Sequence, residues 1–326
     1  MKYSKLGRSS LKVSKLCLGT VNFGFNVSKE DSIKIMDRAF EEGINFFDTA
    51  DTYGYSLFSN GYGEGLTEEI IGDWFKKGNG RREKTIIATK CYGSMGKGIN
   101  DKGLSAYRIK KCCEESLKRM NIDHIDIFYM HHIDRESTWE ELFQAMEQLV
   151  REGKIIYMGS SNFAAWDIAT AQMMAKSRNF LGITVDQSMY NLTQRNIELE
   201  LIPVCRNFGI GLTTYSPLRG GILAGDSKNK SRRKLPEAVR NSKRFENQLK
   251  AYEGLCGEIG ESMAAIAFAW INSNKSVMAP IIGVRTLSQL ENSIKTLEID
   301  LSDDFLKKLD EIWPGPGGEA PEAYIL

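Results

Sequence analysis

Short runs of apolar, often β-branched residues recur along this sequence of 326 residues and alternate with segments of helical periodicity. Several runs are almost entirely apolar, which is typical of strands in a parallel sheet covered by helices. The strand candidates are residues 15–19, 44–48, 85–89, 125–130, 155–160, 183–187, 209–215 and 278–283. A chain of this length also has room for two domains. Eight strand–helix units without a break in composition favour instead an α/β fold, a single (β/α)8 TIM barrel over residues 1–326.

Helix-start signals lie between the strand candidates. Thr138, followed three residues later by Glu141, is a capping-box pattern. Apolar residues then repeat on one helical face, and Gly153 suits the C-terminal cap. We expect further helices over residues 28–43, 105–120 and 262–272.

A doubly wound dinucleotide-binding fold is the main alternative to the barrel. That fold requires a G-x-G-x-x-G turn directly after its first strand. The corresponding segment here reads G-T-V-N-F-G over residues 19–24, which lacks this spacing. The barrel is therefore the preferred interpretation.

Four long irregular segments occupy residues 54–65, 91–104, 219–244 and the tail 313–326. Three of them follow strand candidates and would lie at the C-terminal face of the barrel, where barrel enzymes bind substrate. We interpret these loops and the tail as the rim of a substrate pocket, with ordinary surface loops as the alternative.

The charge balance limits the classes of partner. Lys and Arg total 43 and Asp and Glu total 42, so the net charge of +1 lacks the basic excess of a nucleic-acid-binding face. Hydrophobic residues make up 42%, which argues against disorder. No stretch approaches the roughly 20 apolar residues that span a bilayer, and no signal peptide is evident. We expect a cytoplasmic protein with no nucleic-acid partner and no membrane partner.

The six cysteines include no C-x-x-C pair, so we expect reduced thiols rather than a disulfide framework. Only three histidines are present, namely His124, His131 and His132. A zinc site is therefore not expected, and no residue is assigned as a metal ligand.

Polar residues stand at or just after the ends of early strand candidates: Asp48, Tyr53, Lys90 and His131. In a barrel these strand ends meet at one face, so the side chains are expected to converge. Each residue also has an ordinary alternative. Asp48 could cap a turn, Lys90 could be a solvated strand end, and His131 could be a satisfied barrel histidine. Their joint placement favours a functional site.

This combination suits proton donation to a carbonyl group that receives a hydride. A free phenol, with a pKa of about 10, is a poor acid near neutrality. A neighbouring lysine ammonium favours the phenolate, and an aspartate holds that lysine charged and in place. A histidine can orient the carbonyl oxygen toward the phenol.

Several segments resemble signatures of the aldo-keto reductase family. Residues 47–54 read F-D-T-A-D-T-Y-G, similar to the family's D-T-A-x-x-Y-G. Residues 88–90 (A-T-K) look like its lysine strand, residues 126–131 (D-I-F-Y-M-H) like its D-L-Y-Q-L-H strand, and residues 159–163 (G-S-S-N-F) like its G-x-S-N-F. Gln187 and residues 215–218 and 283–290 resemble its later cofactor motifs. The likeness runs in order from about Leu6 to the tail.

The resemblance implies a barrel that binds NADPH in extended form without a Rossmann domain. It implies Tyr53 as the general acid, tuned by Lys90 and Asp48, and His131 as the residue that positions the substrate carbonyl. The residues that it assigns to the cofactor are Thr20, Asp48, Ser161, Asn162, Gln187, Tyr215, Ser216, Leu218, Gly220, Gly283, Arg285, Gln289 and Asn292.

The resemblance also implies which residues contact each part of the cofactor. Ser161, Asn162 and Gln187 would bond the nicotinamide carboxamide, and Tyr215 would stack on the ring. The pyrophosphate would pass Ser216, Leu218 and Gly220. Arg285 and Gln289 would meet the adenosine ribose and its 2′-phosphate, since arginine fits a phosphate by charge and geometry.

One departure concerns the adenine contact. The family often has Asn four residues after the glutamine, where this sequence has Ser293, with Asn292 one residue earlier. Which of the two meets adenine stays open.

A narrower likeness to a bacterial branch, which includes reductases associated with nucleotide-deoxysugar biosynthesis, rests on residues 93–104, 130–134 and 313–318. His132 and Asp134 could face the substrate or be structural. Candidate pocket-wall residues by loop position are Tyr55, Phe58, Tyr92, Trp139 and Tyr324.

The expected activity is NADPH-dependent reduction of an aldehyde or ketone, a small-molecule carbonyl substrate, to an alcohol. A non-catalytic NADPH-binding regulatory subunit of the same fold is the alternative. The sequence identifies neither the particular substrate nor the oligomeric state.

Overall fold

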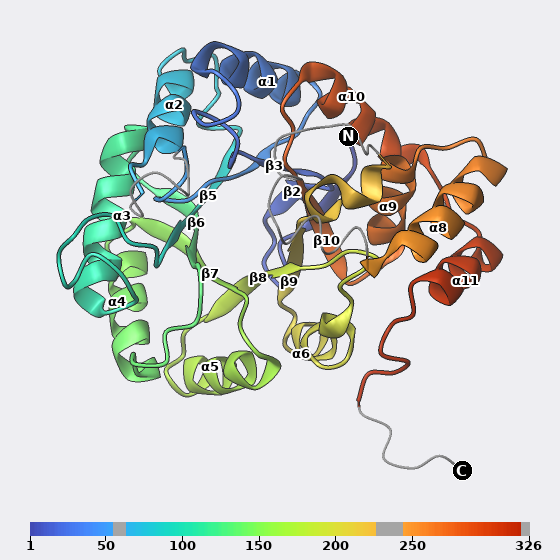
Figure 1. Cartoon of the computed structure of the whole chain (residues 1–326). Coiled ribbons are helices and arrows are strands. Elements are labelled where there is room, and N and C mark those ends of the chain that lie inside the picture. The colour runs from blue at the N-terminus through green and yellow to red at the C-terminus, as the bar shows by residue number, and fades with distance from the viewer. Residues whose placement is uncertain (55–62, 226–243, 321–326) are drawn as a thin grey trace.

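The computed structural model describes residues 1–54, 63–225 and 244–320. Eight parallel strands close into a barrel with the neighbour order β10-β3-β4-β5-β6-β7-β8-β9 (Figure 1). The strands are β3 Cys17–Gly19, β4 Phe46–Asp48, β5 Ile86–Cys91, β6 Ile125–Met130, β7 Ile155–Ser161, β8 Ile183–Met189, β9 Gly211–Tyr215 and β10 Val277–Ile282. Each strand falls on one of the predicted runs, and the predicted (β/α)8 barrel is confirmed.

Helices surround the barrel (Figure 1). They are α1 Lys29–Glu41, α2 Leu66–Phe75, α3 Ala106–Met120, α4 Trp139–Arg151, α5 Ala165–Ser177, α6 Leu201–Phe208, α8 Glu246–Glu258, α9 Met263–Ser273, α10 Leu287–Lys295 and α11 Asp303–Ile312, with 3-10 turns η1 Asn196–Glu198, η2 Arg219–Ala224 and η3 Thr296–Glu298. Within the described ranges, no single helix has the length and apolarity to cross a membrane. The pair α8 and α9, which meets these criteria only jointly, is bent by 87°.

The predicted helix starts are confirmed by their caps. The side chains of Ser28, Ser105, Thr138 and Ser262 each accept a hydrogen bond from the backbone N–H three residues on. These bonds satisfy donors that the first helical turn leaves without intrahelical partners. The four helices therefore begin where the sequence placed them.

Two apolar layers hold the barrel, because successive side chains of a strand point to opposite faces. Phe46 lies in the cluster inside the barrel, and Phe47 packs in the layer between strands and helices. Ile127 and Phe128 divide in the same way on β6. Tyr129 is fully buried inside the barrel.

The sequence did not predict the N-terminal hairpin formed by β1 Tyr3–Lys5 and β2 Lys12–Ser14, which pair antiparallel. Leu6 and Val13 from this hairpin are fully buried in the cluster that fills the barrel interior. Gly7 has a φ of +53°, and a Cβ there would lie 2.5 Å from the Gly211 backbone nitrogen. The hairpin therefore packs directly against β9 at the amino-terminal end of that strand.

The described part of the C-terminal tail is tied to the segment that follows β8. Arg195 donates to the Trp313 carbonyl oxygen at 2.7 Å and pairs with Asp310 at 2.5 Å. Arg206 pairs with Glu319 at 2.7 Å. Residues 321–326 of the tail, and parts of two other expected rim loops, lie outside the described residues.

Candidate active site

The carboxyl-terminal ends of β4, β5 and β6 bring together the four residues that the sequence singled out. Asp48 is the last residue of β4, Lys90 lies next to the end of β5, and His131 directly follows β6. Tyr53 belongs to the turn after β4, and its backbone N–H donates to the Ala50 carbonyl at 3.1 Å. The barrel thus gathers these side chains at one face.

Lys90 is the centre of this group and is fully buried. Its ammonium donates to Asp48 Oδ1 at 2.6 Å, to the Thr49 carbonyl oxygen at 2.7 Å and to the Tyr53 hydroxyl at 3.2 Å. Burial alone would lower the pKa of Lys90, but Asp48 and Tyr53 outweigh it, so the pKa lies above its ordinary value. Lys90 is therefore a charged, buried residue and not a solvated strand end.

The second carboxylate oxygen of Asp48 links the group to the next strands. Asp48 Oδ2 accepts from Gln187 Nε2 at 2.8 Å. The Asp48 backbone oxygen accepts from the Thr20 hydroxyl at 2.9 Å. Asp48, an expected catalytic and cofactor-binding residue, is thus fixed by three partners on β5, β8 and the loop after β3.

His131 is half-buried beside Tyr53, with the two ring centroids 6.1 Å apart. On its other side it stacks on His132 at 5.1 Å. Burial, then the positive charge of Lys90, then His132 hold the pKa of His131 well below its ordinary value of 6.5. The imidazole is therefore neutral at pH 7, and a neutral imidazole offers one donor and one acceptor.

The residues expected around the nicotinamide form a connected row on β7, β8 and β9. The Tyr215 hydroxyl donates to Asn162 Oδ1 at 2.8 Å, and Asn162 Nδ2 donates to the Ser161 hydroxyl at 3.0 Å. Ser161 and Gln187 are buried, and Tyr215 is half-buried. The row supplies amide and hydroxyl groups next to an aromatic ring, the donor set that a carboxamide-bearing ring requires.

The residues expected along the pyrophosphate follow β9. Ser216 and Gly220 have positive φ values of 55° and 65°, and Leu218 is half-buried between them. A Cβ at Gly220 would meet nothing within 4 Å. Gly283, after β10, is exposed and accepts from Asn22 Nδ2 at 3.2 Å. The backbone is exposed at Gly220 and Gly283, which fits a phosphate chain lying against it at these two glycines.

The expected adenosine contacts form a second group where β10 leads into α10. The Arg285 backbone N–H donates to Gln289 Oε1 at 2.8 Å. Ser293 is buried, and its hydroxyl donates to the Gln289 carbonyl oxygen at 2.8 Å. Asn292 is exposed on the same helix. Of the two candidates for the adenine contact, Asn292 is thus the more accessible side chain.

Sequence reasoning missed several contacts that shape the site. The Thr49 carbonyl oxygen, a partner of Lys90, is a backbone atom, and backbone atoms carry no residue-specific signal. The sequence places Arg219 in the expected pyrophosphate loop, but it does not indicate the contact that this arginine makes. Arg219 has a φ of 47° and donates to Met189 Sδ at 3.0 Å.

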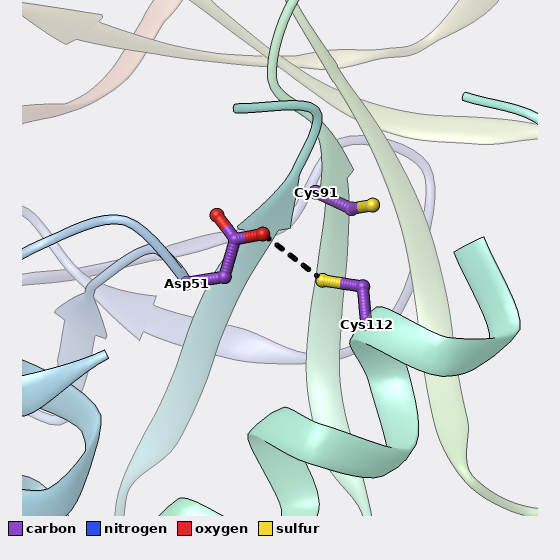
Figure 2. A group of neighbouring side chains, drawn as sticks. All are labelled: Asp51, Cys91 and Cys112. Atoms are coloured by element: carbon purple, nitrogen blue, oxygen red, sulfur yellow. Dashed lines mark hydrogen bonds between the residues drawn. The ribbon is translucent and has the colours of Figure 1, made fainter. Parts of the chain in front are cut away.

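A buried cluster behind Lys90 was also missed. Asp51, Cys91 and Cys112 place one oxygen and two sulfur atoms within 4.8 Å of one another (Figure 2). Arg108 Nη2 donates to Asp51 Oδ2 at 2.5 Å, and burial, followed by the neighbouring Cys91, raises the pKa of the Cys112 thiol well above its ordinary value. Because a guanidinium occupies the carboxylate and the thiol stays protonated, this chemistry opposes a bound cation.

Three of the remaining candidate residues, Asp134, Trp139 and Tyr92, contact neighbouring residues of the protein. Asp134 Oδ2 accepts from the Leu104 backbone N–H at 2.8 Å and so ties two loops together. Trp139 begins α4 and packs at 6.0 Å from the Phe163 ring. Tyr92 lies 5.3 Å from the ring of His132. Three candidates, namely Tyr55, Phe58 and Tyr324, lie outside the described residues.

The molecule is a closed (β/α)8 barrel with a buried lysine–aspartate pair bonded to a tyrosine at its carboxyl-terminal face, the face at which barrel enzymes have their active sites. The sequence profile of the Aldo/keto reductase family matches residues 15–314. The chain belongs to this family.

Relatives match over nearly the full length of the chain. An uncharacterized oxidoreductase of Bacillus subtilis (strain 168), YrpG, is 45% identical over 99% of this chain and 99% of its own. A probable voltage-gated potassium channel subunit beta of Arabidopsis thaliana is 33% identical over 99% of this chain and 100% of its own. Versiconal hemiacetal acetate reductase of Aspergillus parasiticus is 31% identical over 95% of this chain and 96% of its own. The family and these oxidoreductases support carbonyl reduction with a nicotinamide cofactor.

Proposed function

We propose that this protein reduces an aldehyde or ketone to an alcohol with NADPH, and that Tyr53 is the general acid. The observation that carries the proposal is the buried Lys90 ammonium, which bonds Asp48 on one side and the Tyr53 hydroxyl on the other. When bound, the cofactor supplies the hydride.

Side chains of the protein supply the proton and stabilise the charge that its transfer creates. Tyr53 donates its hydroxyl proton to the carbonyl oxygen as negative charge develops there. The Lys90 ammonium, 3.2 Å from that hydroxyl, stabilises the charge left on the tyrosine oxygen. Asp48 keeps Lys90 charged and fixed in place. The neutral His131 beside Tyr53 donates a hydrogen bond that orients the carbonyl.

The row formed by Ser161, Asn162 and Gln187 would hold the nicotinamide carboxamide, and Tyr215 would stack on one face of the ring. An aromatic residue on one face leaves the other face for the substrate. We propose NADPH rather than NADH because Arg285 lies at the start of α10, where a 2′-phosphate gains both a guanidinium and a helix N-terminus.

Replacing Tyr53 by Phe tests the catalytic assignment. Loss of the proton donor should lower kcat for carbonyl reduction by about 100-fold or more, since positioned acids contribute 10² to 10⁴. NADPH affinity, measured by nicotinamide fluorescence, should stay at the wild-type value. A Tyr53→Phe protein that reduces carbonyls at the wild-type rate would refute the assignment.

Replacing Arg285 by Ala tests the cofactor assignment. Loss of a charged hydrogen bond to the 2′-phosphate should weaken NADPH binding by about 10-fold or more and leave NADH binding unchanged. Lys295→Ala, which removes a positive charge from the last turn of the same helix, is the matched control and should change neither affinity. Equal affinity of the wild-type protein for both cofactors would contradict the assignment.

A second candidate function is a non-catalytic NADPH-binding regulatory subunit. The likeness to plant proteins named as probable potassium channel beta subunits favours it. This function predicts tight NADPH binding with negligible turnover across simple aldehydes, quinones, steroids and keto sugars. The joint presence of Asp48, Tyr53, Lys90 and His131 at one face favours the reductase instead.

Two finer assignments accompany the proposal. The similarity to the Bacillus subtilis relative supports the bacterial branch of the family, and the continuous barrel supports one domain over residues 1–326. We propose that the substrate is a small-molecule carbonyl compound and that the protein has no nucleic-acid or membrane partner. NADPH oxidation measured with simple aldehydes, quinones, steroids and keto sugars would identify the class of substrate.

A further inference from the structure

The turn that carries Tyr53 also carries a fully buried carboxylate, Asp51. The Asp51 side chain points to α3, where its Oδ2 accepts from Cys112 Sγ at 3.3 Å (Figure 2). The same oxygen accepts from Arg108 Nη2 at 2.5 Å. Arg108 is 1% exposed, so this is an ion pair with neither partner in solvent. The pair lies two residues from the proposed general acid.

Arg108 contacts a second loop of the same face. Its Nη2 also donates to the Gly93 carbonyl oxygen at 3.3 Å, in the loop after β5. The backbone of Arg108 is fixed in the first turn of α3, because its N–H donates to the capping Ser105 hydroxyl at 3.2 Å. One guanidinium therefore bridges the Tyr53 turn and the loop after β5 from a rigid helix.

The bridged segments fit closely together. A Cβ at Gly93 would lie 2.5 Å from Thr52 Cγ2, so the loop after β5 packs directly on the Tyr53 turn. The Asp51 backbone N–H donates to the Lys90 carbonyl oxygen at 3.3 Å. A shift of Asp51 would therefore move the turn relative to Lys90.

Stability alone does not account for this pair. Burying two charges costs desolvation energy, and well-packed apolar residues of the same volume are often at least as stabilising. An ion pair does, however, fix one geometry. The reacting geometry is sensitive to position, since a misplacement of about 1 Å can cost roughly 100-fold in rate.

We infer that Asp51 and Arg108 are positioning residues: their ion pair holds the turn so that the Tyr53 hydroxyl meets the Lys90 ammonium. The pair also couples this turn to the loop after β5. This inference deepens the proposed function and rests on the role proposed there for Tyr53. Neither residue is expected to touch the substrate.

The kinetic experiment compares Arg108→Met with a matched control, Arg82→Met. Arg82 forms another shielded ion pair, 3.0 Å from Asp126, but near the amino-terminal end of β6, away from the site. In Arg108→Met we expect kcat to fall by about 10- to 100-fold, with NADPH affinity unchanged. The alkaline limb of the kcat–pH profile should also shift, because the Tyr53 hydroxyl is no longer held within hydrogen-bond distance of the Lys90 ammonium. Arg82→Met should keep the wild-type kcat and profile.

Arg108→Lys is the conservative variant. Its ammonium can pair with Asp51, but it is a point charge on a flexible stem and lacks the planar guanidinium that fixes the direction of the bonds from Nη2. We expect its kcat to lie between those of the wild type and Arg108→Met. If Arg108→Met does not fold, Arg108→Lys carries the test, with kcat lowered at an unchanged unfolding midpoint.

A second readout needs no turnover. In protein labelled with 13C at the tyrosine ζ carbon, the Tyr53 signal is identified by its loss in Tyr53→Phe. Its chemical shift should change in the Arg108 variants and stay constant in Arg82→Met. Wild-type kcat, pH profile and Tyr53 signal in a folded Arg108 variant would overturn the inference while leaving the proposed function intact. An active Tyr53→Phe would instead overturn the proposed function.

Discussion

Among single residues, Lys90 and Asp48 of the proposed site are both buried. Lys90 has 0% exposed surface, and its ammonium is surrounded by a carboxylate, a carbonyl oxygen and a hydroxyl. Removing one member of such a pair leaves the other charge buried and uncompensated. Replacing Asp48 alone should therefore affect folding as well as catalysis, whereas Tyr53→Phe removes only one oxygen from the set.

The depressed pKa of His131 makes a prediction about stability and pH. In the unfolded chain this histidine takes up a proton near its ordinary pKa of 6.5, but in the folded protein it does so only at much lower pH. Protonation therefore favours the unfolded state. The stability that His131 contributes is complete above pH 6.5 and is lost as pH falls below that value.

His131→Gln removes this titration while keeping a polar side chain. The free energy of unfolding, measured by urea denaturation from about pH 8 to about pH 5, should fall less steeply in the variant than in the wild type. His124→Gln is the matched control, since its ring lies at the other end of β6 beside Asp123. If the free energy of unfolding falls with pH in parallel for the wild type and His131→Gln, the assigned downward shift of the His131 pKa is wrong.

Part of the site could be predicted from the sequence because it depends on position along strands. Asp48, Lys90 and His131 follow apolar runs, and the closed barrel places such ends together. The Asp51–Arg108 pair could not be predicted in this way. Its members are 57 residues apart, and their contact depends on how α3 packs behind β5.

Among the elements, α3 connects the helix layer to the proposed site, and its first turn depends on one cap. The Ser105 hydroxyl accepts from the Arg108 N–H at 3.2 Å. Ser105→Ala should lower the free energy of unfolding by about 1 kcal/mol, the usual value of a serine cap. Ser10→Ala, at an exposed bend, is the control and should stay within about 0.5 kcal/mol of the wild type. Equal stability of Ser105→Ala and Ser10→Ala in urea denaturation would show that the cap is dispensable.

The elements that the sequence predicted well carry strong local signals. Strands β3 to β10 are apolar runs, and the helix starts at residues 28, 105, 138 and 262 carry capping side chains. The hairpin of β1 and β2 has strands of only three residues each. The equally short β3 and β4 belong to apolar runs, whereas the hairpin strands read Y-S-K and K-V-S, with too few apolar residues to form a run or a detectable period of two. This element therefore becomes visible only in the structure.

At the scale of the whole molecule, the buried hairpin residues and the residues of the proposed site lie at opposite ends of the barrel. The hairpin residues Leu6 and Val13 belong to the interior cluster and pack near the amino-terminal ends of the strands. Asp48, Lys90 and His131 occupy the carboxyl-terminal ends. Barrel enzymes commonly show this division, because loops can vary at one face while the other maintains the fold.

This separation predicts that the two ends respond differently to substitution. Leu6 is fully buried, so Leu6→Ala should lower the free energy of unfolding by about 2–5 kcal/mol through lost burial and a residual cavity. Because Leu6 lies at the end opposite to Tyr53, kcat at a temperature where the variant is folded should stay within about twofold of the wild type, a change under 0.5 kcal/mol in barrier.

Leu11→Ala, at a partly buried position in the same hairpin, is the control and should cost less stability, because less apolar surface is lost. Urea denaturation measures the stabilities, and NADPH oxidation with a reactive aldehyde measures kcat. A folded Leu6→Ala protein with strongly reduced kcat would show that the hairpin acts on the site through the barrel interior, and would argue against the separation of the two ends.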